Sequence, residues 1–245
     1  MSNATEIHAI LWDMDGTLIN SEDIYIKQLN SILSAQFQSG PLSKEVVSKI
    51  QGRPGLKISE ILVDEYRLGD RTSSQKFYDI TNQPEQLKLY RETAFLPGIQ
   101  DFLSHVKTVH NLPMAIATST TRLKYNAKTT HLDFSFFDLT LTGGDHPRLK
   151  GKGKPQPYIW HETLAELNEK LGTNIKMENC LIFEDSVSGI QSGLAAGGKT
   201  VWIPSNPEAV KALSDEEMSY YKSNCEAILG DFLQFDNNKY SFISL

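Results

Sequence analysis

The sequence predicts an α/β fold in which helices cover both faces of a parallel sheet, with a small all-helical second domain. From about residue 98 onward, short apolar runs alternate with helical patterns, as they do in such sheets. An earlier segment, residues 7–12, which contains the apolar run 9–12, is assigned to the same sheet as its first strand. Between them, nothing in residues 20–95 alternates like a strand.

Composition restricts the classes of function. The chain has 245 residues, of which 40% are hydrophobic and 22% charged, as is ordinary for a globular protein. Its net charge of −6 argues against a general nucleic-acid binder and against attraction to an anionic membrane. A small anionic ligand must then be bound by local groups. We also expect a monomer.

Cysteine usage and the first residues bear on the compartment. Cys180 and Cys225 are too few for a disulfide framework or a cysteine-based zinc site. Residues 1–8 lack the features of a secretion signal, and no apolar run approaches the roughly 18 residues of a membrane span. We expect a cytoplasmic protein, with the nucleus left open.

The helical insert follows the first strand. Its helical patterns cover residues 21–36, 46–50, 58–66 and 84–95. In the rest of the chain, strands are expected at residues 113–118, 138–142, 180–183 and 200–203. Helices are expected at residues 98–110, 121–132, 157–171 and 188–196, with further helical stretches at 207–213 and 227–232.

Two acids and a glycine follow the first strand. Asp13 and Asp15 stand two apart on an extended chain, so both carboxylates face one spot at a ligand-binding sheet edge. Charges about 4 Å apart repel by roughly 4 kcal/mol at an effective dielectric of about 20, which favours a shared proton or a bound Mg²⁺. Gly16 permits a turn whose N–H groups approach a bound anion, and Thr17 could buttress it. The alternative is a polar turn without chemistry.

Hydroxyl residues end the strand at 113–118. Thr118, Ser119 and Thr120 lead into a helix start, where N–H groups and hydroxyls make an anion site. Ser119 and Thr120 are candidates for substrate binding, although for Thr120 and Thr121 we favour helix capping alone.

A basic loop and a second pair of acids follow. The glycine-flanked loop 151–157 can deliver one ammonium, that of Lys154, to a fixed point. A nucleic-acid patch is the other interpretation of this loop, but the loop lacks aromatic residues and the protein is acidic. Glu184 and Asp185 follow the strand at 180–183, where acids that complement a helix dipole are the alternative. The histidines show no metal-ligand spacing.

In this order, the four stretches resemble the motifs of the haloacid dehalogenase-like hydrolase superfamily. They are residues 13–18, the strand end at Thr118, Lys154 before Pro155, and the pair Glu184 and Asp185. The resemblance covers most of the chain, and the insert takes the place of the family's small helical cap. It implies a Rossmann-like core of residues 1–19 and 96–245, with a cap of residues 20–95.

The resemblance also implies a phosphatase that works through an aspartyl-phosphate. Asp13 would attack phosphorus, while Asp15 would protonate the leaving alcohol and later activate water. Thr118 and Lys154 would hold the phosphoryl oxygens.

The implied cofactor is Mg²⁺. It would lie among Asp13, Asp185 and the carbonyl of Asp15. Glu184 would either bind the metal or orient the other ligands.

Three rivals to a phosphatase remain. A dehalogenase would not need the acid Asp15, and phosphomutases of the helical-cap group commonly carry a histidine where our alignment places Tyr25. A non-catalytic metabolite sensor should have lost one of the four motifs, and none is missing. Hydrolysis is therefore favoured.

The substrate is expected to be a nucleoside or sugar monophosphate. Residues 51–55 look like the cap's specificity loop, in which Arg53 could contact a substrate hydroxyl or phosphate, or else cap a turn at the surface. The insert, residues 145–148 and residues 151–155 most resemble the eukaryotic pseudouridine-5'-phosphatase-like group, which implies pseudouridine 5'-phosphate. Relatives that act on glycerol phosphate or deoxysugar phosphates share the four motifs.

Overall fold

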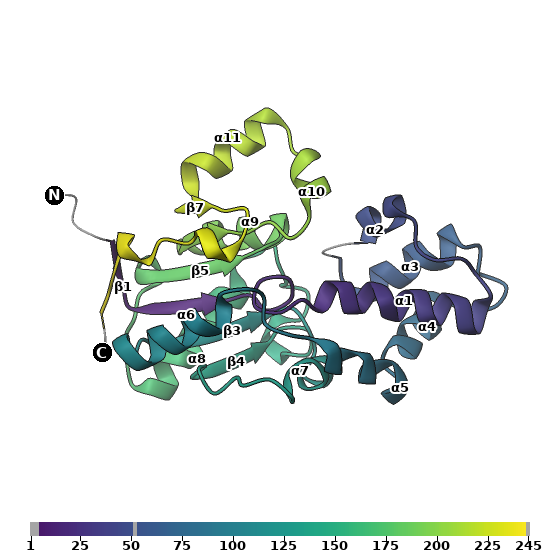
Figure 1. Cartoon of the computed structure of the whole chain (residues 1–245), viewed down its shortest axis with the longest axis horizontal. Coiled ribbons are helices and arrows are strands. Elements are labelled where there is room, and N and C mark those ends of the chain that lie inside the picture. The colour runs from purple at the N-terminus through teal and green to yellow at the C-terminus, as the bar shows by residue number, and fades with distance from the viewer. Residues whose placement is uncertain (1–4, 51–52, 244–245) are drawn as a thin grey trace.

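The computed structural model describes residues 5–50 and 53–243, and its architecture confirms the predicted α/β class. Six parallel strands form one sheet in the order β4-β3-β2-β5-β6-β7 (Figure 1). Their bounds are β2 Ala9–Trp12, β3 Met114–Thr118, β4 Leu139–Thr142, β5 Cys180–Glu184, β6 Lys199–Trp202 and β7 Ala227–Ile228. Because all six strands run the same way, their carboxyl ends meet at one edge of the sheet.

Helices cover both faces of this sheet. The face that carries Trp12 packs against α6 (Ile99–His105), and the face that carries Leu11 packs against α8 (Tyr158–Leu171) and α9 (Val187–Ala196). All four side chains of β2 are buried, since a central strand of such a sheet has apolar neighbours on both sides. The other core elements are η2 Val106–His110, α7 Arg122–Thr129, η3 Pro147–Leu149, η4 Met177–Asn179, α10 Pro207–Lys211, α11 Asp215–Asn224, η5 Phe232–Gln234 and η6 Asn237–Lys239.

The expected first strand, residues 7–12, is wrong in its extent. The chain bends at His8, and β1 (Thr5–Ile7) leaves the main sheet to pair in parallel with β8 (Tyr240–Phe242). Both strands lie beside the chain termini in Figure 1. A local apolar pattern cannot reveal a partner strand at the other end of the chain.

The helical stretch expected at residues 227–232 is also wrong. Ala227 and Ile228 instead form β7, because the N–H groups of Glu226 and Leu229 donate to carbonyls of β6 at 2.9 Å. The sequence prediction also omits α11, which has little apolar periodicity although Ser214 opens it with a capping box.

The insert contains only helices among its described residues. They are α1 Ser21–Phe37, α2 Lys44–Ile50, α3 Gly55–Glu65, α4 Ser74–Thr81, α5 Pro84–Leu87 and η1 Lys88–Glu92. These helices enclose a separate apolar cluster, in which Phe37 stacks on Phe77 at a ring distance of 5.6 Å. Burying each such ring stabilises the packing by about 1.5–3 kcal/mol.

Two chain crossings join the insert to the core. The N–H of Asn20 donates to the carbonyl of Ala94 at 3.1 Å, and the N–H of Leu96 donates to that of Leu18 at 2.9 Å. The Asn20 side chain accepts a further hydrogen bond from Ala94 at 2.8 Å. The crossings therefore lie side by side, and the domain boundaries after residues 19 and 95 stay a prediction.

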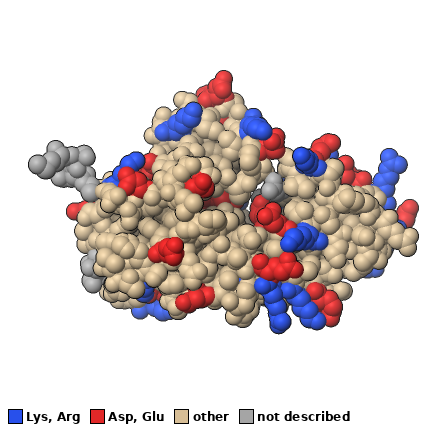
Figure 2. Space-filling view, viewed as in Figure 1, with Lys and Arg blue, Asp and Glu red and all other residues tan. Residues whose placement is uncertain are grey.

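Charged side chains are unevenly spread on the visible face of the molecule. Figure 2 shows Lys, Arg, Asp and Glu interspersed mainly over the insert and over its junction with the core. Among the described residues, no helix has both the length and the apolar character needed to cross a membrane.

Candidate active site

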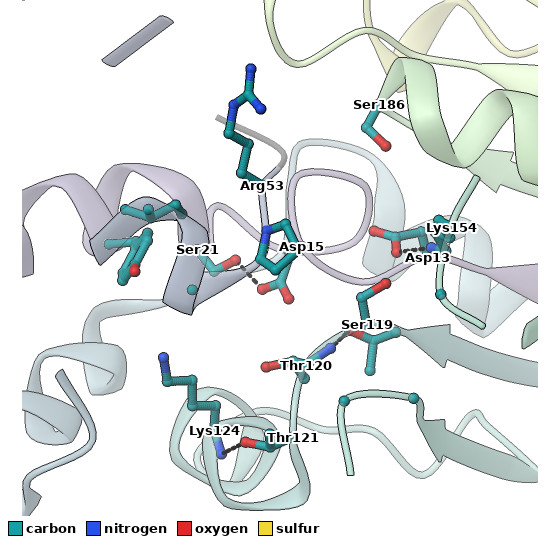
Figure 3. Close-up of a pocket in the computed structure, with 18 of the residues that line it drawn as sticks. Asp13, Asp15, Ser21, Arg53, Ser119, Thr120, Thr121, Lys124, Lys154 and Ser186 are labelled. Atoms are coloured by element: carbon teal, nitrogen blue, oxygen red, sulfur yellow. Dashed lines mark hydrogen bonds and ion pairs between the residues drawn. The ribbon is translucent and has the colours of Figure 1, made fainter. Parts of the chain in front are cut away.

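Three neighbouring strands bring the predicted residues together. Asp13 directly follows β2, Thr118 ends β3 and Glu184 ends β5. Because the sheet order places β3 and β5 on either side of β2, these residues meet at one carboxyl edge. The edge opens toward the helical insert, as the labelled side chains in Figure 3 show.

Asp13 lies at the centre of this edge. Its N–H donates to the carbonyl of Phe183 at 3.0 Å, which fixes the turn after β2. One carboxylate oxygen, Oδ1, accepts from Lys154 Nζ at 2.5 Å, and Oδ2 accepts from the hydroxyl of Thr17 at 3.5 Å. Burial raises the pKa of Asp13 to about 7, opposed by the ammonium of Lys154 and reinforced by Glu184. A positive charge in addition to that of Lys154 would favour the anionic form of this group.

Lys154 reaches the same edge of the sheet, where its ammonium is held by several acceptors. Its side chain is 6% exposed, and its ammonium bonds Asp13 at 2.5 Å, Glu184 at 2.6 Å and the carbonyl of Ala117 at 3.3 Å. The ammonium also lies 4.7 Å from the centre of the Trp160 ring. Burial alone would lower the pKa of Lys154, but the two carboxylates together raise it above its usual value. The lysine therefore stays charged.

Glu184 is fully engaged by protein donors. Oε1 accepts from Lys154, and Oε2 accepts from the N–H groups of Asp185 at 3.0 Å and Ser186 at 3.1 Å. Gly189 permits this placement, since a Cβ there would stand 1.9 Å from the carboxyl carbon of Glu184. This geometry favours the second of the two predicted roles, in which Glu184 orients its neighbours.

Asp185 lies opposite the turn at Gly16. Its Oδ1 accepts from Thr17 at 3.3 Å, and its Oδ2 accepts from the hydroxyl of Ser205. Gly16 has a φ of +84°, and a Cβ at this position would come within 2.4 Å of Asp185 Oδ2. Burial raises the pKa of Asp185, and Glu184 and Asp13 raise it further.

These carboxylates fit a hard divalent cation. Asp13, Glu184 and Asp185 each offer an oxygen within 4.8 Å of the others. The sequence assigned Asp15 to the metal through its backbone carbonyl. The side chain of Asp15 is not part of this cluster. The role of that carbonyl stays a prediction.

Asp15 is held by two residues that sequence reasoning missed. Its Oδ1 accepts from the hydroxyl of Ser21 and from Lys128 Nζ at 2.6 Å. The available signal was Lys128 itself, which lies one turn after Lys124 on the helix that follows Thr118, so both lysines share a face of α7.

The hydroxyl cluster contains one residue that caps a helix and one at the tip of a strand. Thr121, rather than Thr120, caps α7, and its side chain accepts from the N–H of Lys124. The Thr118 hydroxyl is buried and accepts from the N–H of Thr120 at 3.2 Å. Ser119 and Thr120 line the cavity beside it.

Arg53 lies at the rim of the same cavity. Its Nε donates to the carbonyl of Lys49 at 2.6 Å, at the end of α2, and in Figure 3 its side chain extends away from Asp15. Two residues of the proposed specificity loop, Gln51 and Gly52, lie outside the described residues. The contact is that of a turn-capping arginine, and a role toward substrate stays a prediction.

A cavity of about 580 Å³ joins these groups and is walled by both the core and the insert. The core contributes acids, hydroxyl residues and lysines, among them Asp13, Asp15, Asp185, Thr118, Ser119, Thr120, Lys124, Lys128 and Lys154. The insert contributes tyrosines and apolar side chains, among them Tyr25, Tyr78 and Tyr90. Its volume suits a small organic ligand.

A second group of possible ligands lies elsewhere. His146, Glu162 and Glu166 cluster on the core, and the ring of His146 lies 3.1 Å from Glu166. The guanidinium of Arg148 contacts Glu162 at 2.5 Å and Glu166 at 2.8 Å, which already supplies a positive charge. Asp13 and Asp185 line the cavity described above, whereas none of these three residues does, so the cluster around Asp13 is the better placed for a metal that acts on a bound ligand.

The geometry can be compared with known proteins. A family model described as haloacid dehalogenase-like hydrolase matches residues 10–203. The chain belongs to this family. The matched region runs from β2 through β6, so it contains all four of the motif stretches recognised in the sequence.

Relatives of this hydrolase bear on its reaction class. A Saccharomyces cerevisiae protein described as a probable pseudouridine-5'-phosphatase is 41% identical over 219 residues, covering 89% of this chain and 90% of that protein. The family member described here is accordingly a phosphoric monoester hydrolase that acts on phosphorylated metabolites.

Solved structures share the fold of this hydrolase. CbbY from Rhodobacter sphaeroides in complex with phosphate matches with a TM-score of 0.69 at 20% identity, over 93% of this chain and 96% of that one. A β-phosphoglucomutase from Clostridium difficile matches with a TM-score of 0.69 at 18% identity, over 96% and 97%. At these identities the likeness concerns the fold alone.

Proposed function

We propose that this hydrolase is a Mg²⁺-dependent phosphatase that works through an aspartyl-phosphate on Asp13. The observation that carries the proposal is the buried contact of Lys154 with both Asp13 and Glu184, at 2.5 and 2.6 Å. This contact aims one carboxylate and one ammonium at the same point of the cavity, where a phosphoryl group needs a nucleophile and a counter-charge.

In the first step, a carboxylate oxygen of Asp13 attacks phosphorus. The bond from phosphorus to the leaving oxygen breaks, and that oxygen takes a proton from Asp15 to become an alcohol. Lys128 and Ser21 both bond Oδ1 of Asp15, which leaves Oδ2 to carry the proton toward the leaving group. Thr118, Ser119 and Lys154 hold the phosphoryl oxygens.

In the second step, water attacks phosphorus of the aspartyl-phosphate and gives its proton to the Asp15 carboxylate. The bond between phosphorus and the Asp13 oxygen breaks, which releases inorganic phosphate and restores both aspartates. Asp15 thus serves as acid and then as base.

The carboxylates of Asp13 and Asp185 would hold the metal, with Glu184 orienting Lys154 beside it. Bound there, Mg²⁺ supplies positive charge that offsets both the crowded carboxylates and the phosphoryl oxygens. Without a cation these acids would repel a phosphate dianion.

Nucleoside and sugar monophosphates are the proposed substrates, including pseudouridine 5'-phosphate. The yeast relative's description and the cavity volume of about 580 Å³ support this class. A phosphomutase is the second candidate, since one shares the fold. Burial raises the pKa of Tyr25 above its usual value, so its hydroxyl is a poor proton carrier in place of a mutase's histidine.

A substrate panel tests the proposal. Phosphate release is measured with nucleoside monophosphates, pseudouridine 5'-phosphate, sugar phosphates and glycerol phosphates, with sugar 1-phosphate isomerisation followed in parallel. We expect release with Mg²⁺ and its loss by roughly 10³-fold or more in Asp13→Asn. Asp101→Asn, an exposed change on α6, serves as the control.

The outcomes separate the candidates. Phosphate release that survives in folded Asp13→Asn would refute the assignment of Asp13 as the nucleophile. Isomerisation without release would favour a mutase, and neither activity on any compound would refute an enzyme of this class.

A further inference from the structure

Lys124 is a buried ammonium in the wall of the cavity. It lies on α7, is 8% exposed, and its side chain extends from the helix toward the insert in Figure 3. Its Nζ lies 5.5 Å from the ring centre of Tyr25 and 5.0 Å from that of Tyr78. Within residues 5–50 and 53–243, no oxygen acceptor or carboxylate pairs with this ammonium.

The nearby lysine of the same helix shows the contrast. Lys128, one turn further along α7, has its positive charge paired with Asp15 at 2.6 Å. Among the described residues, the ammonium of Lys124 meets only the faces of two tyrosines, which attract a cation but accept no conventional hydrogen bond from it. Burial, helped by the charge of Lys128 and opposed by Asp15, lowers the pKa of Lys124 to about 8. A buried ammonium without a hydrogen-bond acceptor is costly, so an acceptor atom of a bound ligand would stabilise it.

A second unpaired polar group lies beside it. The hydroxyl of Tyr25, on α1, is buried and has no hydrogen-bond partner among the described residues. This is an independent sign of a missing ligand atom, because buried hydroxyls are normally hydrogen-bonded. The hydroxyl comes from the insert and the ammonium from the core, and both residues line the cavity.

The tyrosine wall is a built feature. Gly55 opens α3, and a Cβ there would lie 2.6 Å from the ring of Tyr78, so the ring reaches its place only because this residue is glycine. Tyr90 lines the same space and lies under the ammonium of Lys128 at 5.1 Å. Ring-shaped groups pack well on such aromatic walls.

The position of Lys124 on α7 indicates which part of the substrate it contacts. In the proposed reaction Asp15 protonates the leaving oxygen, so the leaving group lies beside Asp15 and its partner Lys128. Lys124 is one helical turn, about 5.4 Å, along the same face of α7. It therefore flanks the leaving group rather than the phosphoryl group.

We infer that Lys124 and the hydroxyl of Tyr25 together bind acceptor oxygens on a ring of the leaving group, and so select phosphates of oxo-substituted nucleosides over simple alkyl or aryl esters. The inference rests on the proposed function and deepens it. An ammonium and a hydroxyl can both donate to ring carbonyl oxygens, and the tyrosine faces accept the ring itself.

The test compares two phosphates that differ in acceptor oxygens. Uridine 5'-monophosphate carries a ring with carbonyl oxygens, whereas phenyl phosphate carries a ring with none. We expect Lys124→Met to lower kcat/KM about tenfold or more for uridine 5'-monophosphate, mainly through KM, and by less than about threefold for phenyl phosphate. Tyr25→Phe should act in the same direction, more weakly, and Lys124→Arg should restore part of the loss.

A binding measurement separates this inference from the proposed function. In the Asp13→Asn background, the Kd of uridine 5'-monophosphate is measured by calorimetry with and without Lys124→Met. Lys76→Met, an exposed change on α4, is the matched control. A wild-type enzyme that releases phosphate from no compound of the substrate panel would overturn the function, while a tenfold weaker Kd in Lys124→Met would still support the binding site.

Two results would overturn the inference. Equal losses on both phosphates would mean that Lys124 serves the phosphoryl group or the fold. No change in Kd in either Lys124→Met or Tyr25→Phe would mean that these groups do not contact the leaving group.

Discussion

Lys128 Nζ lies 2.6 Å from Oδ1 of Asp15, so a lysine of α7 is paired with the second aspartate of the first motif. Ser21, the first residue of α1 in the insert, donates to the same oxygen. One carboxylate is thus oriented from the core and from the insert at once. This pairing depends on how the insert sits over α7.

The first prediction concerns this pair. Lys128→Met should lower kcat by roughly 10- to 100-fold with little change in KM, because Asp15 loses its charge partner and its orientation but keeps its proton-transfer chemistry. Steady-state kinetics on phenyl phosphate measure the effect. Lys152→Met, an exposed change in the loop that holds Lys154, should leave kcat near the wild-type value. An unchanged kcat in Lys128→Met would show that the pair does not assist the reaction.

The second prediction concerns the metal. Enzyme treated with EDTA should lose activity, and Mg²⁺ should restore it, since Asp13 and Asp185 otherwise repel a phosphate dianion. Ca²⁺ should inhibit, because its larger and looser coordination shell misplaces the attacking oxygen.

Thermal unfolding gives a readout of the metal that is independent of activity. Mg²⁺ should raise the Tm of the wild type and have little effect on Asp185→Asn, because a ligand that binds only the folded state stabilises it. Full activity in metal-free buffer, or an equal rise in Tm for both proteins, would contradict the assignment.

The third prediction concerns Arg53. If its loop reads the leaving group, Arg53→Ala should lower kcat/KM for the natural substrate much more than for p-nitrophenyl phosphate. The hydrogen bond from Arg53 to Lys49 at 2.6 Å supports the competing role, in which the arginine only ends α2. In that case the variant lowers the Tm slightly and changes neither kcat/KM. Equal losses of kcat/KM on both substrates would indicate that Arg53 contacts the phosphoryl group.

The fourth prediction uses the pH dependence of stability. The pKa of Lys124 is about 8 in the fold, below its ordinary value of 10.5, because of burial and the charge of Lys128. Between these two pH values the unfolded chain holds a proton that the folded chain has released, so stability rises with pH. Asp15 opposes this lowering of the pKa, and the Tyr25 and Tyr78 rings face the ammonium.

Urea unfolding at two pH values measures the effect. Relative to Lys124→Met, the wild type should gain about 2 kcal/mol of unfolding free energy between pH 7.5 and pH 9.5. Taking the difference in unfolding free energy between the two proteins cancels the contributions of the other titrating groups. A constant difference across this range would show that the fold does not lower the pKa of Lys124.

The four motif stretches could be predicted because each lies where a strand ends. Asp13, Thr118 and Asp185 follow or end short apolar runs, and the parallel sheet brings such ends to one edge. The pattern that predicts the strands thereby also predicts that their polar neighbours meet. Lys154 was found through its glycine-flanked loop, and the structure places its ammonium between Asp13 and Glu184.

The errors at the ends of the chain have a different cause. Residues 7–12 are apolar apart from His8, but the bend at His8 depends on β8, which pairs with β1. Likewise Ala227 and Ile228 become a strand only because β6 offers a free edge. Local propensity is weaker than such pairing, so it could not predict either outcome.

By itself, the sequence determined the fold class, the family and the residues around Asp13, because these follow from the spacing of apolar runs and from short contiguous motifs. Only the tertiary structure decided the wall of the cavity around Lys124. Tyr25, Tyr78 and Lys124 come from α1, α4 and α7, and they meet because the insert's helices pack over the core. Contacts between distant segments are set by complementary packing and burial, which no local pattern of residues records.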